Sequence, residues 1–285
     1  MTQGNAAGDH QRVNILGVGV SAINMHQALA VLTDCIEQRQ RCYVVVCPVY
    51  TVMLCQSRPD LRRVVNEAAL VTPDGMPLVF LSRWLGYSQV DRVYGPDLML
   101  AFSQMAAARG YSSFYYGGGD GVAARLGEVL ARRFPGLHTA GAYSPPFREE
   151  AEPEDPAIIQ MINAAQPDVI WVGLGSPKQE YWMARHRPLL DAPVLIGVGA
   201  AFDIHTGRVA QAPRWMQRSA LEWLFRLLQE PQRLWRRYLV YNPLFVIQVL
   251  LQLLGLRHPP DLTASATLEP AHPVERTQRH DQSHP

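Results

Sequence analysis

Short apolar runs alternate with helical patterns over most of the chain. The runs are rich in β-branched and aromatic residues, which is typical of strands buried on both faces of a sheet. Glycine, proline and polar clusters separate them. Strands are therefore predicted at residues 13–18, 42–47, 68–71, 90–93, 112–116, 138–143, 168–173 and 194–198.

Segments with apolar residues at helical spacing lie between these runs. One helix is predicted from a cap at Ser21 to Ile36, and a short one after Pro48. Further helices are predicted after Gly75, at 59–69, 96–109, 122–134 and 157–165, and from Pro177. Strands and helices that alternate at this spacing predict an α/β protein with a mainly parallel sheet.

The pattern changes after Ala212. Pro213 is predicted to start a long helix, and Pro231 either ends that helix or begins the next one. Residues 243–254 are mostly apolar but too few to span a bilayer. They predict either an interfacial helix or a core helix.

The same region gathers positive charge. Residues 208–257 contain eight arginines and two glutamates, a local net charge of +6, whereas the whole chain carries only +1. Three interpretations fit: contact with a lipid or nucleic-acid backbone, a clamp on a diphosphate, or a solvated helix face. The neighbouring apolar helix favours an anionic membrane surface over nucleic acid.

The composition is that of an ordinary globular protein. Lys178 is the only lysine among 26 basic residues, so the cationic chemistry is almost wholly that of arginine. The cysteines lack metal-site spacing and are interpreted as buried apolar residues in a reducing cytosol. Four segments are predicted: a flexible N-terminus at 1–12, an α/β core at 13–207, an arginine-rich appendage at 208–257 and a disordered tail at 258–285.

A tight turn after the third predicted strand presents a candidate catalytic carboxylate. Pro73 and Gly75 favour the turn, which leaves Asp74 at the edge of the sheet. Asp74 either caps the following helix or takes part in chemistry, and the turn alone favours the cap.

Three further loops follow predicted strands. Gly117, Gly118 and Gly119 precede a helix, where main-chain N–H groups bind phosphate well, although a neutral turn fits equally. Gly175, Lys178 and Gln179 follow another strand, in a segment that also fits a helix capped by Ser176 with Pro177 at its first position. Asp203 follows the next strand, where it would accept from a sugar hydroxyl or pair with an arginine.

Several of these segments together resemble one known family. The residues that carry the resemblance occur in order at 70–75 (LVTPDG), 92–98 (RVYGPDL), 173–180 (GLGSPKQE), 199–203 (GAAFD), 221–226 (LEWLFR) and 231–233 (PQR). Over about residues 13–256 the chain resembles the WecG/TagA/CpsF glycosyltransferase family. The resemblance implies a Rossmann-like core with a C-terminal appendage that meets the inner face of the cytoplasmic membrane.

The resemblance also implies a reaction and its residues. An inverting transferase would move a sugar from a UDP-sugar to a polyprenyl-diphosphate-linked saccharide, without a metal or other cofactor. Asp74 would be the general base, Gln179 would position a substrate, and Arg92 would stabilise diphosphate charge. Donor binding is predicted for Gly117, Gly118, Gly119, Gly175, Lys178 and Asp203. Lipid-diphosphate binding is predicted for Arg226, Arg233 and Arg236.

The chain departs from the family at residues 47–49. The family often has Thr-x-Asn there, whereas this chain has Cys47, Pro48 and Val49. The change leaves the donor sugar open between an N-acetylhexosamine and a hexose such as glucose, as in exopolysaccharide synthesis. Two other functions also stay open: an NAD(P)-dependent oxidoreductase that uses the glycine loop, and a non-catalytic scaffold docked on the membrane.

Overall fold

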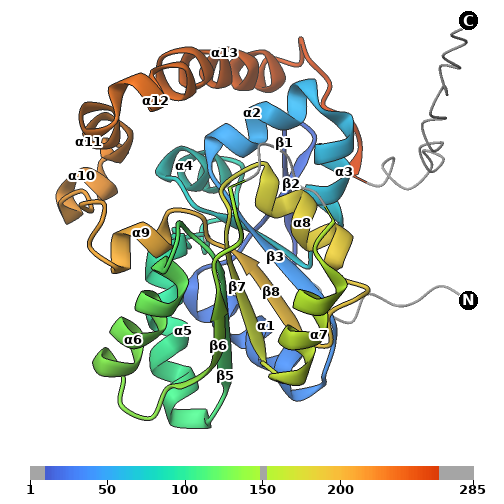
Figure 1. The fold of residues 1–285 in the computed structure, drawn as a ribbon. Coiled ribbons are helices and arrows are strands. Elements are labelled where there is room, and N and C mark those ends of the chain that lie inside the picture. The colour runs from blue at the N-terminus through green and yellow to red at the C-terminus, as the bar shows by residue number, and fades with distance from the viewer. Residues whose placement is uncertain (1–9, 148–152, 263–285) are drawn as a thin grey trace, which may run out of the picture.

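A six-stranded parallel sheet forms the centre of the computed structural model, which describes residues 10–147 and 153–262 (Figure 1). The strand order is β4-β3-β8-β7-β5-β6, and every neighbouring pair is parallel. The predicted α/β class is confirmed. The strands are β3 (Cys42–Cys47), β4 (Leu70–Pro73), β5 (Ser112–Gly117), β6 (His138–Tyr143), β7 (Val169–Gly173) and β8 (Val194–Gly197).

Helices cover both faces of this sheet. Val44 and Val46 of β3 face a core under α1, α5 and α6, while Val45 and Cys47 face the opposite core under α2, α3 and α8. Alternate side chains of one strand enter different cores, which is why the run is apolar throughout. The helices of the core are α1 (Met25–Glu37), α2 (Val49–Ser57), α3 (Pro59–Glu67), α4 (Met76–Trp84), α5 (Gly95–Arg109), α6 (Val122–Arg133), α7 (Pro156–Ala164), α8 (Lys178–His186) and α9 (Ala201–His205).

The first predicted strand is wrong in form. Leu16 and Gly17 both have positive φ, at 54° and 83°, so the segment turns back on itself. It forms the antiparallel hairpin β1 (Arg12–Ile15) and β2 (Val18–Ser21). Ser21 therefore ends a strand instead of capping a helix, and Asn24 caps α1.

Residues 90–93 also form no strand. The Val93 N–H donates to the Pro73 carbonyl at 3.0 Å, and the Thr72 hydroxyl donates to the Val93 carbonyl. Pro73 has no N–H with which to continue a ladder, so the segment lies beside β4 as an extended loop.

The C-terminal appendage contains shorter helices than predicted. The helix expected from Pro213 breaks at residues 219–221, where Ala220 has φ +58°. Pro231 begins the next helix, and a π-helical turn precedes Pro243, which has no N–H to donate. The elements are α10 (Arg214–Arg218), α11 (Glu222–Gln229), α12 (Pro231–Trp235), η1 (Arg236–Val240) and α13 (Tyr241–Leu253).

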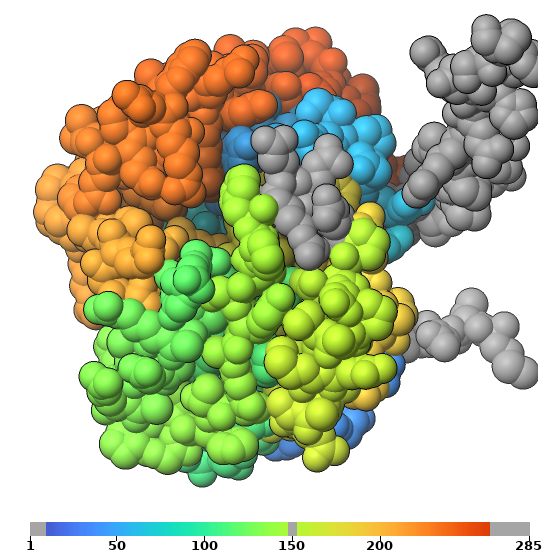
Figure 2. All heavy atoms as spheres, viewed as in Figure 1, coloured from blue at the N-terminus to red at the C-terminus, as the bar shows by residue number. Residues whose placement is uncertain are grey.

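The appendage is packed on the core. In the space-filling view it forms a continuous orange band over one end of the molecule, above the green segments of α5 and α6 (Figure 2). Phe245 and Val249 of α13 are buried in the core shared with α2. At the far end the Gln252 side chain accepts from Leu16 N–H and donates to the Asn14 carbonyl.

Parts of the predicted termini lie outside the described residues. The sequence predictions for 1–9, for the acidic linker at 148–152 and for 263–285 fall there. Residues 258–262, assigned to the tail, lie near the hairpin, and Asn14 donates to the Pro260 carbonyl at 3.0 Å. Among the helices of the described ranges, none combines the length and hydropathy needed to cross a membrane.

Replacement of Phe245 tests the packing of α13. Phe245→Ala is expected to lower the free energy of unfolding by about 3 kcal/mol, because it removes a buried ring from the contact with the core. Urea denaturation measures this change. Ile247→Ala, on the exposed face of the same helix, is the control and should cost less than about 0.5 kcal/mol. Equal effects of the two substitutions would contradict the packing.

Candidate active site

The loops that follow the strands surround three adjoining cavities. The appendage cavity lies between the Asp74 turn and α11. The strand-end cavity is lined by the end of β8 and the segment after β7. The glycine-loop cavity lies beside β5 and β7. The first two share Asp74 in their walls. Ligands of open α/β sheets bind at this edge, beyond the carboxyl ends of the strands.

Asp74 is held by the main chain on both sides. Its N–H donates to the Cys47 carbonyl at 3.2 Å, and its Oδ1 accepts from Gly95 N–H at 3.3 Å. Gly95 is the first residue of α5, so Asp74 interacts with the start of α5. The expected cap on the following helix is wrong, since α4 begins after Gly75 without a side-chain cap.

The surroundings make Asp74 a stronger base than an ordinary aspartate. Burial raises the pKa of Asp74 to about 6, while the nearby Arg92 lowers it and Glu222 raises it. Such a carboxylate is mostly ionised at neutral pH but accepts a proton more readily than one with a pKa near 4. The geometry therefore suits proton transfer.

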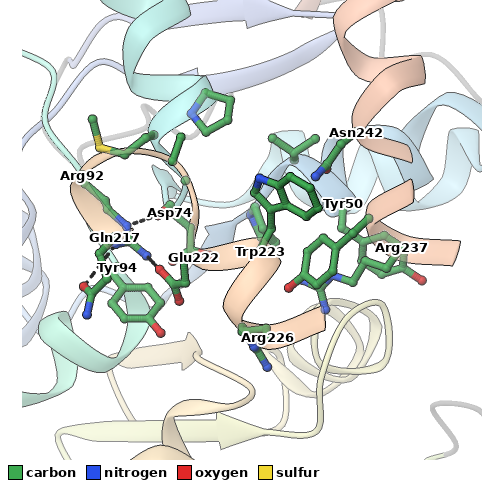
Figure 3. Close-up of a pocket in the computed structure, with 17 residues that line it drawn as sticks. Tyr50, Asp74, Arg92, Tyr94, Gln217, Glu222, Trp223, Arg226, Arg237 and Asn242 are labelled. Carbon is green, nitrogen blue, oxygen red and sulfur yellow. Dashed lines mark hydrogen bonds and ion pairs between the residues drawn. The ribbon is translucent and has the colours of Figure 1, made fainter. Parts of the chain in front are cut away.

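Arg92 lies in the wall of the appendage cavity with its nitrogens already bonded (Figure 3). Nε donates to the Asp74 carbonyl at 2.6 Å, Nη1 donates to Gln217 at 3.3 Å, and Nη2 pairs with Glu222. The guanidinium also stacks on Tyr94, with Cζ 4.0 Å from the ring centre. Its assigned role on a diphosphate stays a prediction.

Two other arginines present unsatisfied donors to the same cavity. Nε of Arg226 and Nε of Arg237 are buried and have no hydrogen-bond partner in the described part of the chain. Arg237 lies over the ring of Tyr50 at 4.5 Å, and burial lowers its pKa. Partly buried guanidinium groups with an unpartnered N–H are suited to bind an anion.

Arg237 was missed by sequence reasoning, which named Arg236 instead. Arg236 is exposed, beside Trp235, and lines none of the three cavities. Arg233 and Arg237 both line the strand-end cavity and stand four residues apart, the spacing of one helix face. That spacing could have pointed to Arg237, but Arg236 was named because its position matched the family pattern.

The strand-end cavity brings together residues from distant parts of the chain. Asp74, Gln179 and Gly175 line it together with Arg226 and Arg233. Gln179 is buried; its Nε2 donates to Glu180 at 3.4 Å, and its Oε1 has no partner among the described residues. With the amide in this orientation, Gln179 offers an acceptor to a hydroxyl or N–H group of a ligand.

The start of α8 differs slightly from the sequence prediction. The helix begins at Lys178, and Ser176 does not cap it. The Ser176 hydroxyl instead donates to Glu180 at 2.6 Å, across the first turn.

The glycine-loop cavity collects most of the predicted donor-binding residues. Gly118, Gly119, Lys178 and Asp203 line a cavity of about 550 Å³, beside the buried rings of Tyr116 and Trp182. A nucleotide sugar fits within such a volume, since small-molecule sites typically enclose about 300–1000 Å³.

Gly117 and Gly175 lie beside this group. Gly117 has φ +127°, and a Cβ there would come within 2.7 Å of the Gly173 main chain, so the close approach of β5 and β7 requires glycine. Gly117 lines none of the three cavities, and Gly175 lines the strand-end cavity. Asp203 also pairs with Arg208 at 3.4 Å, as one of its two interpretations predicts, while its contact with a sugar stays a prediction.

No metal site stands out in the described ranges, 10–147 and 153–262, where no three His, Cys, Asp or Glu residues are grouped to hold an ion. The four cysteines are free and buried, in agreement with their interpretation as apolar residues. The absence of a cofactor stays a prediction.

Comparison with known proteins agrees with this arrangement. The Glycosyl transferase WecG/TagA/CpsF family matches residues 13–259. An N-acetylglucosaminyldiphosphoundecaprenol N-acetyl-beta-D-mannosaminyltransferase of Bacillus spizizenii is 32% identical over 218 residues, which cover 76% of this chain and 82% of that protein. The protein of the same name from Bacillus subtilis is 31% identical over 180 residues, covering 63% and 68%.

The parallel sheet, the cavities at its strand ends and these matches define the class of the protein, which is a glycosyltransferase. The chain belongs to the WecG/TagA/CpsF family. The resemblance seen in the sequence is thereby confirmed, while the roles of the individual site residues stay predictions.

Asp74 is expected to destabilise the fold above its unfolded pKa. Because folding raises its pKa from 3.8 to about 6, the protonated form is favoured in the folded state. The loss of stability caused by ionised Asp74 is small at pH 4 and reaches its full size above the folded pKa. Asp74→Asn should therefore stabilise the protein by about 2 kcal/mol more at pH 8 than at pH 4. Urea denaturation at both pH values measures this difference, and the same change at both would contradict the raised pKa.

Proposed function

We propose that the protein is an inverting glycosyltransferase that moves a sugar from a UDP-sugar to a polyprenyl-diphosphate-linked saccharide, with Asp74 as general base. This proposal rests on the position of the Asp74 carboxylate. It lies in a wall shared by two cavities, which Arg226 and Arg237, each with an unpartnered Nε, also line. A base next to buried cations suits attack by a hydroxyl on a diphosphate-activated sugar.

The reaction needs one displacement. Asp74 takes the proton of the acceptor hydroxyl while the oxygen of that hydroxyl bonds to the anomeric carbon of the donor. The bond from that carbon to the UDP oxygen breaks, and UDP leaves with the electron pair. Attack from the face opposite the leaving group inverts the anomeric centre. Arg226, Arg233 and Arg237 would stabilise the diphosphate charge that develops.

The donor is assigned to the glycine-loop cavity. Its glycines allow close approach of a diphosphate, Lys178 is a cation at its wall, and Asp203 would accept from a ribose or sugar hydroxyl. From there the sugar would reach the strand-end cavity, where Gln179 offers its unpaired carbonyl oxygen.

The acceptor is assigned to the appendage side. The relatives are named as transferases that act on N-acetylglucosaminyldiphosphoundecaprenol, a lipid-linked diphosphate sugar. The unpartnered arginines support a diphosphate there, and the exposed apolar residues of α13 support contact with the inner face of the cytoplasmic membrane. The exposed residues are Leu244, Val246, Ile247, Leu250, Leu251 and Leu254.

The donor sugar belongs to one of two classes, an N-acetylhexosamine or a hexose. The relatives are named for transfer of N-acetylmannosamine. In this chain Val49 lines the appendage cavity, at a position where the family pattern often has asparagine. A hexose donor such as UDP-glucose, in the synthesis of an exopolysaccharide or other surface polysaccharide, fits that loss of a polar group.

Replacement of Asp74 tests the base. Asp74→Asn is expected to lower the transfer rate at least about 100-fold, because the amide cannot accept the proton, while UDP binding survives. UDP release is measured with a panel of UDP-sugars and a synthetic polyprenyl-diphosphate acceptor, and the product by mass spectrometry. Asp34→Asn, on the exposed face of α1, is the control. Near-normal turnover of the Asp74 variant would refute the role, and no UDP release by the wild type would favour a scaffold.

Charge on the outer face of α13 tests the membrane contact. The double variant Ile247→Glu, Leu250→Glu is expected to bind vesicles of anionic lipid at least about 10-fold more weakly, because two carboxylates would enter the apolar boundary of the bilayer. Sedimentation with vesicles measures binding. Leu189→Glu is the control outside the appendage, with 55% exposure against 54% and 52% for the two test residues. Equal loss in both proteins would contradict a specific contact.

A further inference from the structure

A buried ion pair joins the appendage to the Asp74 turn. Glu222 of α11 pairs with Arg92, 130 residues earlier in the chain, and their side chains are only 13% and 14% exposed. Pairs on the protein surface contribute little, but a pair this secluded is costly to break, because each charge has lost much of its water.

Two of the three guanidinium nitrogens of Arg92 donate to residues of the appendage. Gln217 of α10 and Glu222 of α11 accept from Nη1 and Nη2, and the Asp74 carbonyl accepts from Nε. The guanidinium therefore contacts the main chain of Asp74 and makes no ion pair with its carboxylate in the described structure. Within the described residues, the hydrogen bond that reaches this carboxylate comes from Gly95 N–H.

We propose that Glu222 is a positioning residue for the transfer reaction: it holds Arg92 against the main-chain carbonyl of Asp74, and so leaves the carboxylate free to take the proton of the acceptor. The inference rests on the proposed function, since it assigns Asp74 as the base. It names a carboxylate of the appendage, where the sequence reasoning named only arginines.

The carboxylates of Glu222 and Asp74 compete for the guanidinium of Arg92. Without Glu222, Arg92 would keep its charge in a secluded site, and the Asp74 carboxylate is the neighbouring anion that can neutralise it. Pairing would stabilise the ionised form of Asp74 and make it a weaker base. Burial and then Glu222 raise the pKa of Tyr94, which lines the same cavity as Glu222.

The sign of the effect follows from all the charged and titratable groups around Asp74. Loss of Glu222 removes a negative charge and frees a positive one, and both changes lower the pKa of Asp74. The groups that face Asp74 are Cys47 of β3, Arg92 and Tyr94 of the loop before α5, Glu222 and Arg226 of α11, and Arg237 of η1.

The test measures the titration of Asp74 in the full-length protein. Carbon-13 NMR of aspartate-labelled protein follows the carboxyl signal, which Asp74→Asn assigns. Glu222→Gln is expected to lower the midpoint by about one pH unit or more, and Glu222→Asp to restore most of it. In the pH profile of the UDP-release rate, the fall on the acid side should move to lower pH by the same amount. The maximum rate should also be lower. Glu128→Gln, which breaks an exposed pair with Arg132, is the control and should change neither.

A double-mutant cycle separates positioning from direct repulsion. In an Arg92→Met background, Glu222→Gln should shift the midpoint much less, because no guanidinium remains to move. The double variant removes both members of the ion pair, so neither is left secluded without its partner, and it is the safer variant for folding. An unchanged midpoint in Glu222→Gln, or the same shift with and without Arg92, would overturn the proposal. The expected shift in a protein that releases no UDP would overturn the proposed function and support the positioning.

Discussion

Parallel pairing of six strands places the segments after β4, β5, β7 and β8 at one edge of the sheet. Residues from positions 74, 118, 175 and 199 meet there because the strands point the same way. The main-chain bonds of Asp74 to Cys47 and Gly95 then fix a carboxylate in a site that raises its pKa. Its unfavourable burial is offset by the rest of the fold, as is common where chemistry requires a perturbed group.

The appendage completes this edge with charges of both signs. Its positive charge is not spread evenly over a solvated face, since Arg226 and Arg237 keep buried, unpartnered nitrogens beside Asp74. Glu222 pairs with one core arginine, and neither Arg226 nor Arg237 forms an ion pair in the described structure. The result is a site where the Asp74 carboxylate and these guanidinium groups line the same cavities without forming ion pairs with one another in the described structure.

Much of the core was predictable because its strands are continuous apolar runs, which only a sheet covered on both faces explains. The misses lie where a turn or a neighbouring segment, and not the hydrophobic period, decided the local form. Leu16 turns beside a glycine, residues 90–93 meet a proline that cannot extend a ladder, and Ala220 breaks a helix. Asp74 was noticed at its turn, and the family resemblance assigned it as the base. Glu222 was not found, because pairing across 130 residues leaves no local pattern, whereas the spacing of Arg237 from Arg233 was a local signal that was passed over.

The appendage is attached at both ends. At one end Glu222 holds Arg92, and at the other Gln252 bonds to Leu16 and Asn14 of the hairpin, with Phe245 in the core between them. The appendage is thus fixed at two separate places and cannot rotate as a rigid body about a single hinge. Between these two places the helical path is interrupted at Glu230 and at η1, so bending would concentrate there. A load applied along α13 would be carried by the hairpin at one end and, at the other, by Arg92, which bonds to the Asp74 carbonyl.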